Sequence, residues 1–411
     1  MLGYESARWY RIAAMLFDSH LRLEHRAFAA QDAARRSERA REARAAVTTR
    51  AALEIEYLPF GPADAAGDPT CEVVAAFAEV ELEYAAIRSG AALVDCPHRA
   101  TLTLRGKDRV DFVNRLVTQD IAKLVDGGVA RAFLINRKGR IEADLVIVKL
   151  ADILLIDTLV HDAAAVQTAL EKALFAEEVT IESRLATHAR IALHGPKSEA
   201  ALKALGLDAA GLTAWSAPLG DARAEIWRLD ELGAIGFALS VPVSSVASVW
   251  RSLVTFGARP AGWFATNTAR VEAGTPLFRI DFGPTNLPHE TGVLASRVSF
   301  TKGCYPGQEV VARMQNLGKP KQKLVGLRVE ADLLPVGDAQ VFAIAEDGVH
   351  FGDQIGVVTS SAIAPMLGAV PVAFAMISSS SYADATKVLV NAEGAQAAAT
   401  VGSLVFLEGA S

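Results

Sequence analysis

A thiol stands among turn-forming residues in the stretch SFTKGCYPGQEVVARM, residues 299–314. A cysteine acts as a nucleophile only as its thiolate, and a neighbouring cation lowers the pKa of the thiol. Lys302 lies two residues before Cys304 and would have this effect if both side chains faced the same pocket. The alternative is that Cys304 is a small buried apolar residue in a loop shaped by its glycines. No histidine base stands nearby in the sequence, so protease-like nucleophilic catalysis is not indicated.

A second candidate is Asp144, a carboxylate in the otherwise apolar run of the segment NRKGRIEADLVIV. Such a side chain in a strand points either to solvent or into a pocket, where loss of hydration would raise its pKa. Strand alternation places Glu142 and Asp144 on the same side. A solvated face and a functional site are both compatible with this pattern.

A third candidate pair, Arg270 and Glu272, leads into a turn in the segment ARVEAGTPLFRIDF. The planar guanidinium of an arginine can bind a carboxylate through two parallel hydrogen bonds. A surface salt bridge is the alternative interpretation. His98 and His289 stand alone in the sequence, and we expect each of them to be structural.

The elements that must position these residues are mixed strands and helices. Residues 79–90 read as a helix, residues 107–124 as a helix with one apolar face, and residues 130–160 as three successive strands. A second unit of similar type covers residues 189–256. Neighbouring strands joined by short turns predict antiparallel α+β sheets rather than a parallel Rossmann sheet.

The pattern changes after residue 322, where short strands alternate with glycines and predict a small β-barrel or sandwich. Residues 355–382 contain no charged side chain, which raises the question of a membrane-spanning helix. Pro365, Pro371 and several hydroxyl side chains would weaken such a helix. We therefore expect two buried strands joined by a loop that contains proline.

Composition narrows the class of protein. A chain of 411 residues predicts two or three domains. The net charge of −6 argues against broad electrostatic binding to nucleic acid or to an anionic membrane. Three cysteines without a C-x-x-C pair argue against a disulfide scaffold and a self-contained metal site. Free thiols suit the reducing cytosol, so we predict a cytoplasmic protein.

The first fifty residues contain ten arginines and six acidic residues, which is not the composition of a secretory signal. Apolar residues at helical spacing between Trp9 and Phe17 predict an amphipathic helix, followed by a charged helix.

Several segments resemble the folate-binding aminomethyltransferase superfamily, the glycine-cleavage T-protein and its relatives. ELEYAAIRSGAALVDCPHRATLTLRGKDRVDFVNRLVTQDI resembles the start of that family, and TARVEAGTPLF resembles its R-x-E-a-g-x-P-L-y-G segment. LINRKGRIEADLVIV is similar to its N-x-x-G-g-i-x-D-D-L segment, with Asp144 at the second aspartate and Ala143 in place of the first. Residues 353–377 resemble the family's barrel signature. The resemblance covers about residues 79–408.

Within the superfamily, TNLPHE and the following VSFTKGCYPGQEVVARMQNLGKPKQKLVGL are similar to the YgfZ branch. Proteins of that branch bind tetrahydrofolate and maintain iron–sulfur enzymes, whereas T-proteins have no cysteine at this place. The resemblance therefore implies tetrahydrofolate, or another folate, as the cofactor. It also implies transient partners among iron–sulfur enzymes or their assembly factors.

The fold implied by the resemblance is α+β, with two ferredoxin-like modules around a central folate cavity and a C-terminal β-barrel. The implied domains are a helical leader and linker at 1–75, the folate-binding domain at 76–320 and the barrel at 321–411. In this picture Asp144 faces the pterin as hydrogen-bond acceptor or base, while Arg270 and Glu272 shape the cavity. The signature site at its rim consists of Lys302, Cys304, Gln308 and Glu309.

The function implied first is a tetrahydrofolate-binding accessory factor for iron–sulfur cluster assembly or repair, which would support tRNA modification indirectly. The alternative is a folate-dependent aminomethyl or methyl transferase of the T-protein type. Cys304 in its motif favours the first, while Asp144 is common to both. For either function we expect a monomer that contacts neither nucleic acid nor membrane directly.

Overall fold

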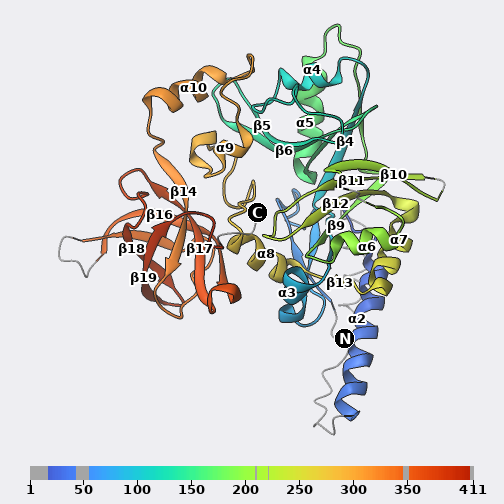
Figure 1. Cartoon of the computed structure of the whole chain (residues 1–411). Helices are drawn as coiled ribbons and strands as arrows, with labels where there is room; N and C mark the ends of the chain where they lie inside the picture. Colours follow the sequence, from blue (N-terminus) through green and yellow to red (C-terminus); the bar gives the residue numbers. More distant parts are fainter. Residues whose placement is uncertain (1–16, 43–54, 209–210, 221, 346–350, 408–411) are drawn as a thin grey trace.

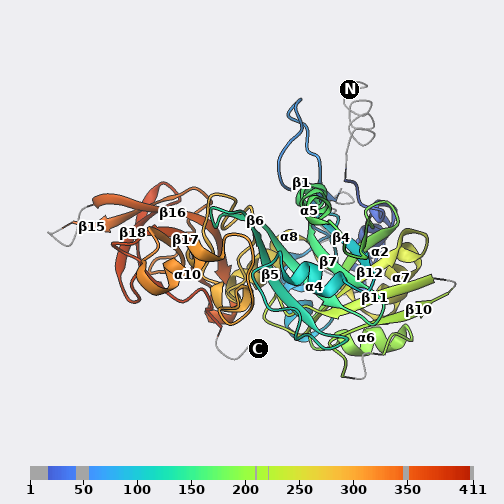
Figure 2. The same ribbon diagram turned by 90° about the horizontal axis from the view of Figure 1, so that it is seen from above.

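A computed structural model of the chain describes residues 17–42, 55–208, 211–220, 222–345 and 351–407. Two β-sheets with their helices form one part of the molecule, and a closed β-barrel lies beside them. The view from above shows the same side-by-side arrangement (Figure 2). The predicted α+β class with a C-terminal barrel is therefore confirmed.

The first sheet has five antiparallel strands in the order β5-β6-β7-β4-β8. Helices α4 and α5 cover one face, where Leu102, Phe112 and Val166 belong to a common core. The three strands predicted over residues 130–160 are β5, β6 and β7. The bounds are β4 Arg99–Arg105, α4 Arg109–Asn114, β5 Val129–Ile135, β6 Ile141–Lys149, β7 Leu154–Leu159, α5 Val160–Ala173 and β8 Thr180–Ser183.

The helix predicted over residues 107–124 is shorter than expected, because α4 ends at Asn114. The chain then runs beside β5: the backbone N–H of Thr118 donates to the carbonyl of Phe133, and the Thr118 hydroxyl accepts from the Phe133 N–H. The side-chain oxygen of Asn114 accepts from the N–H of Ile121 and closes the intervening turn. Pairing with the sheet thus overrides the helical spacing of the apolar residues.

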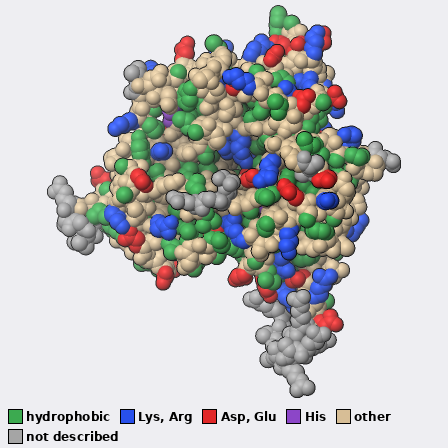
Figure 3. Space-filling view, viewed as in Figure 1, with side chains coloured by type: hydrophobic (Ala, Val, Ile, Leu, Met, Phe, Trp, Pro, Cys, Tyr) green, Lys and Arg blue, Asp and Glu red, His purple; other side chains and the backbone are tan. Residues whose placement is uncertain are grey.

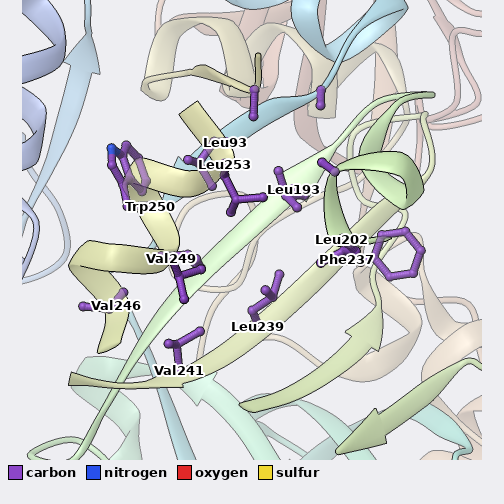
Figure 4. Close-up of a cluster of buried hydrophobic side chains, with 14 of the residues drawn as sticks. Leu93, Leu193, Leu202, Phe237, Leu239, Val241, Val246, Val249, Trp250 and Leu253 are labelled. Carbon is purple, nitrogen blue, oxygen red and sulfur yellow. The ribbon is translucent and has the colours of Figure 1, made fainter. Parts of the chain in front are cut away.

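The second sheet has six strands in the order β10-β11-β12-β9-β3-β13, with only the short β13 parallel to its neighbour among these pairs. Helix α7 packs Trp250 and Leu253 against Leu93, Leu193 and other strand residues (Figure 4). The bounds are α3 Val80–Ser89, β3 Ala92–Asp95, β9 His188–His194, α6 Ser198–Ala204, β10 Ala214–Leu219, β11 Ala222–Arg228, β12 Gly236–Pro242, α7 Val243–Phe256 and β13 Arg259–Pro260.

The two sheets face each other through apolar side chains. Val146 and Leu155 of the first sheet share a buried cluster with Trp227 and Ala238 of the second. Residues of β6 that point away from helices α4 and α5 are therefore directed toward the second sheet. This side of β6 includes the neighbourhood of Asp144.

The N-terminal segment lies against the second sheet. Helix α2, Arg22–Glu42, is the charged helix that the sequence predicts, and it is followed by a two-stranded sheet of β1, Glu56–Pro59, and β2, Glu72–Ala76. Most of the amphipathic helix predicted between Trp9 and Phe17 lies outside the described residues.

Short helices connect the sheets to the barrel: α8 Trp263–Glu272, η1 Pro288–Glu290, α9 Leu294–Arg297 and α10 Gln308–Leu317. The barrel closes in the order β14-β17-β16-β15-β18-β19. Its first strand begins at Gln322, near the predicted boundary, and the division into domains stays a prediction. The barrel bounds are β14 Gln322–Val329, β15 Gln340–Ile344, β16 Phe351–Ala364, η2 Pro365–Leu367, β17 Val370–Ser378, β18 Lys387–Ala392 and β19 Ala395–Gly402.

The uncharged run at residues 355–382 forms most of β16, η2 and β17, which pair as antiparallel strands. The expectation of two strands joined by a loop with proline is confirmed. Within the described ranges no helix has the length and apolar character needed to cross a membrane.

Candidate functional site

A cavity lies where the second sheet, β2 and α8 meet, and it holds about 810 Å³ of space including its open mouth. Its apolar wall includes Val73, Val94 and Trp263. A few polar groups converging on an apolar pocket are typical of a small-molecule site. The charged and imidazole-bearing residues in its lining are Asp95, His98, Arg99, Arg190, His194, Glu231 and Arg270.

Two arginines of the wall share one carboxylate. Nη2 of Arg99 lies 2.6 Å and Nε of Arg190 lies 3.4 Å from different oxygens of the fully buried Asp157. The Arg190 guanidinium also stacks 4.6 Å above the ring centre of Trp227. Asp157 thus neutralises only one of these two positive charges, and Glu231 of the cavity wall also acts electrostatically on Arg99.

Glu231 of the cavity wall forms an ion pair with Arg131 on β5 of the first sheet. Burial alone would raise the pKa of Glu231, but Arg131 and Arg99 outweigh it and lower this pKa to about 2. Glu231 is therefore ionised at neutral pH. The pair joins the cavity lining to the first sheet.

Asp144 lies on the same face of the first sheet, on β6, opposite Phe133 of β5. Its Oδ1 accepts a hydrogen bond from Nε of Arg297 at 3.3 Å, and its side chain is 15 % exposed. Asp144 also interacts electrostatically with Arg131 and Arg99. Asp144 is thus connected electrostatically to the cavity wall, through Arg99 of the lining and through Arg131, which pairs with Glu231, although Asp144 is not among the residues that line the cavity.

Arg270 lines the cavity, but its donors are occupied. Its Nη1 lies 2.8 Å from Oδ2 of Asp281, and its Nη2 donates to the hydroxyl of Ser360 at 2.6 Å. Ser360 belongs to barrel strand β16. Arg270 therefore shapes the cavity by holding α8 against the barrel, and a clamp on a ligand carboxylate would have to displace these partners.

Glu272 is fully buried and lies outside the cavity lining that the structure describes. Its carboxylate accepts from the Tyr84 hydroxyl at 2.5 Å and pairs with Nη2 of Arg88 at 2.6 Å. It also accepts from the N–H of Met366 in the barrel. These contacts give Glu272 a role in joining α3, α8 and the barrel, and direct binding of a ligand stays a prediction.

The loop that contains Lys302 and Cys304, here called the signature loop, is anchored by Lys302, which is buried. Its ammonium donates to three backbone carbonyls, those of Asn114, Val117 and Gln119. Burial lowers the pKa of Lys302 to about 8. None of the contacts described for the chain joins Lys302 to Cys304, so the expectation that both face one pocket finds no support.

Cys304 is exposed, which argues against the interpretation as a buried apolar residue. Gly307 at the start of α10 has φ +80°, and a Cβ there would lie 2.4 Å from the carbonyl of Asn136. This close approach packs the loop on the turn between β5 and β6. Gln308 and Glu309 begin α10, with Glu309 exposed, and neither lines the cavity.

No role was predicted from sequence for three further residues of the site. Asp95 ends strand β3, Arg297 ends α9, and His194 ends β9. Each is isolated in the sequence, and only the packing of distant segments brings it to the site. His194 is 4 % exposed and its Nδ1 has no hydrogen-bond partner in the described structure.

His98 was expected to be structural, but it lines the cavity. No group of three or more metal-binding side chains is found in the described part of the chain. In the view of Figure 3, Lys and Arg side chains gather in the middle of the molecule, between the barrel and the sheets.

Known proteins resemble this chain over most of its length. The aminomethyltransferase of Caldanaerobacter subterraneus subsp. tengcongensis is 28% identical over 303 residues, which cover 71% of this chain and 78% of that protein. The aminomethyltransferase of Synechococcus sp. (strain RCC307) is 28% identical and covers 80% of this chain and 91% of its own. The crystal structure of the glycine cleavage system aminomethyltransferase T from Bartonella henselae matches with a TM-score of 0.76 and 25% identity, over 86% of this chain and 94% of that one.

Two family models account for both parts of the molecule. The GCVT N-terminal domain matches residues 3–302, a range that begins before α2 and ends inside the signature loop. The glycine cleavage T-protein C-terminal barrel domain matches residues 322–408. The chain therefore belongs to the GCVT family, the family of the glycine-cleavage T-protein.

Proposed function

We propose that this chain binds tetrahydrofolate in the cavity and acts as a folate-dependent aminomethyltransferase. The observation that supports this most is the position of Asp144, the aspartate that the family resemblance singles out, next to Arg297 and electrostatically coupled to the cavity wall. The named relatives are aminomethyltransferases, which favours a transferase over an accessory factor.

The cavity has the groups that a folate would need. Trp263 and the apolar wall would pack against the bicyclic ring, and the unpartnered Nδ1 of buried His194 would supply a hydrogen bond. Arg99 and Arg190 share a single carboxylate and would attract the carboxylates of the glutamate moiety. A bound tetrahydrofolate supplies nitrogen atoms that take up a one-carbon group.

Asp144 would hold or accept a proton near that reaction, and Arg297 fixes the position of its carboxylate. Arg131 and Glu231 would carry the electrostatic connection between Asp144 and the ligand. Glu272 and Arg270 would keep the cavity closed on the barrel side through the contacts described above.

The experiment is calorimetric titration with 5-formyltetrahydrofolate. Asp144→Asn keeps the shape but removes the charge, and loss of a charged hydrogen-bond partner should weaken binding by about 1.5–3 kcal/mol. Glu142→Gln is the matched control, since Glu142 is an exposed neighbour on the same strand. Absence of binding by the wild-type protein would contradict the proposal.

A second candidate function is the iron–sulfur accessory role implied by the YgfZ resemblance. It is favoured by one feature, the exposed Cys304 on a loop that Lys302 and Gly307 anchor. In this role the thiol would meet a partner protein, and the folate site would be retained.

Complementation of a deletion strain separates the two functions. For a transferase, deletion abolishes the use of glycine as nitrogen source, and Cys304→Ser restores it as well as wild type does. If deletion instead impairs an iron–sulfur-dependent tRNA thiolation and Cys304→Ser fails to restore it, the accessory role is correct.

A further inference from the structure

The N-terminal segment Phe17–Glu42 covers the outside of the cavity wall. The N–H of Phe17 donates to the carbonyl of Thr70 at 2.9 Å, just before strand β2. Leu21 and His25 are both fully buried, and Leu21 packs in the same core as Leu93 of β3. Strand β3 therefore has the cavity at one end and the N-terminal segment against its side.

Asp95, the last residue of β3, connects the cavity with the N-terminal segment. It lines the cavity, and its side chain is only 7 % exposed. Its Oδ2 accepts a hydrogen bond from the Ser19 hydroxyl at 2.5 Å and lies 3.4 Å from Nε2 of His25. Both contacts with the N-terminal segment use the same oxygen, Oδ2.

No lysine or arginine forms an ion pair with Asp95 among the described residues. Arg22 of the N-terminal segment acts on Asp95 electrostatically, and its guanidinium is paired with Asp18 and with Glu72 of β2. His25 is neutral because burial lowers its pKa to about 3. A buried carboxylate without a cationic partner is costly, whereas its protonated form is a hydrogen-bond donor.

Burial raises the pKa of Asp95 to about 7, against the opposing effects of Ser19 and Arg22. Near Asp95, Asp18 and Glu72 belong to the ion pairs above, and burial raises the pKa of Tyr57 and of Cys71 to about 12. The other charged residues of the cavity lining are Arg99, Arg190, Glu231 and Arg270. On the cavity side, burial lowers the pKa of His98 to about 3 and that of His194 to about 4, and it raises that of Cys96 to about 12.

We propose that Asp95 is a ligand-binding residue of the cavity whose neutral carboxyl group donates a hydrogen bond to an acceptor atom of the bound folate, and that Ser19 acts through it as a positioning residue. This rests on the proposed folate site and assigns it a hydrogen-bond donor at the end of strand β3. A carboxylic acid that burial keeps in its protonated form can serve as a donor in this way. The N-terminal segment thereby contributes to binding without touching the ligand.

The test is titration of 5-formyltetrahydrofolate into the full-length protein between pH 6 and pH 8.5. Wild-type affinity should fall by at least about tenfold over this range, because the donor is lost as Asp95 ionises. Asp95→Asn keeps a donor at every pH, so its affinity should stay within about threefold of the wild-type value at pH 6 and show no such fall. Asp95→Leu should lose about tenfold or more at pH 6.

Ser19→Ala separates positioning from mere packing. The Ser19 hydrogen bond favours the ionised carboxylate, so its loss should move the midpoint of the pH profile to a higher pH. Ser37→Ala is the matched control on the same segment, since the Ser37 hydroxyl bonds only the carbonyl of Ala33 in its own helix in the described contacts. This control should leave the profile unchanged.

Two outcomes would overturn the inference: wild-type-like affinity of Asp95→Leu, or a wild-type pH profile in Asp95→Asn. If Asp95→Leu does not fold, as judged by its thermal transition, the Asp95→Asn profile decides alone. If the wild-type protein binds no folate at any pH, it is the proposed function that fails. Binding that is independent of Asp95 leaves the proposed function intact and removes only this inference.

Discussion

Arg297 and Asp144 meet across 153 residues of sequence, with Nε of the arginine 3.3 Å from Oδ1 of the aspartate. The arginine ends α9 shortly before the signature loop, and the aspartate lies inside β6. Their contact fixes the entrance of that loop relative to the sheet that carries the family's aspartate. The contact thus joins α9, just before the loop, to strand β6.

Replacing Arg297 by methionine should leave the carboxylate of Asp144 without its cation. Breaking a largely buried pair from one side should lower the free energy of unfolding by about 3 kcal/mol, measured by urea denaturation. The exposed Arg313→Met is the control and should change it by less than about 0.5 kcal/mol. Adding Asp144→Asn should recover part of the loss, and strict additivity of the two changes would contradict the pairing.

Glu231 should make the stability of the protein depend on pH at the acid end. Its pKa of about 2 in the folded protein lies below the ordinary value of 4.5. The unfolded chain therefore binds the proton first, so the stabilisation is complete above pH 4.5 and disappears as the pH falls toward 2. Denaturation of wild type and Glu231→Gln should differ at pH 7 and converge at low pH. The exposed Glu182→Gln should show no such convergence.

The three cysteines should differ sharply in reactivity. Cys304 is exposed, whereas Cys71 and Cys96 are buried and burial raises the pKa of each thiol to about 12. Iodoacetamide should therefore modify Cys304 alone in the native protein and all three cysteines after unfolding. Peptide mass spectrometry gives the extent at each site. Preferential modification of Cys71 or Cys96 in the native state would show that the signature loop is placed differently.

Lys302→Met should make the signature loop more mobile and leave the reactivity of the Cys304 thiol nearly unchanged. Loss of the three hydrogen bonds to the carbonyls of Asn114, Val117 and Gln119 should speed amide hydrogen exchange in residues 114–121 and 299–305. The alkylation rate of Cys304 should change by less than about threefold, because the ammonium contacts the backbone and not the thiol. Lys319→Met, at an exposed position, is the control. A strong fall in the alkylation rate would mean that the cation acts on Cys304 directly.

Much of the fold could be predicted because its signals are local. Alternation in residues 130–160 and the glycine-spaced strands after residue 322 both describe what the structure contains. The helix over residues 107–124 was predicted too long, since no local pattern shows that Thr118 pairs with β5. Sheet pairing over a distance outweighed helical spacing there.

The site was less predictable, because its charges come from unrelated segments. Asp144 and Arg270 could be selected through family motifs. Glu231 and Arg297 could not. Asp95 lies in the segment that resembles the start of the family, but no role was predicted for it, because its partner Ser19 lies far away in sequence. An effect of Lys302 on Cys304 stays a prediction, because the ammonium donates to three backbone carbonyls while the thiol is exposed.

Glu272 receives, besides its side-chain contacts, hydrogen bonds to its carbonyl from the N–H groups of Phe406 and Leu407. These two residues follow the last barrel strand, while Glu272 ends α8 on the opposite side of the connection. A ribosome must therefore release more than 130 residues beyond α8 before that helix end obtains these partners. Domains generally fold in the order of their synthesis, but this contact between the sheets and the barrel can form only after translation has reached the end of the barrel. Ribosome-bound chains stalled between residues 320 and 402 would carry both sheets without this contact.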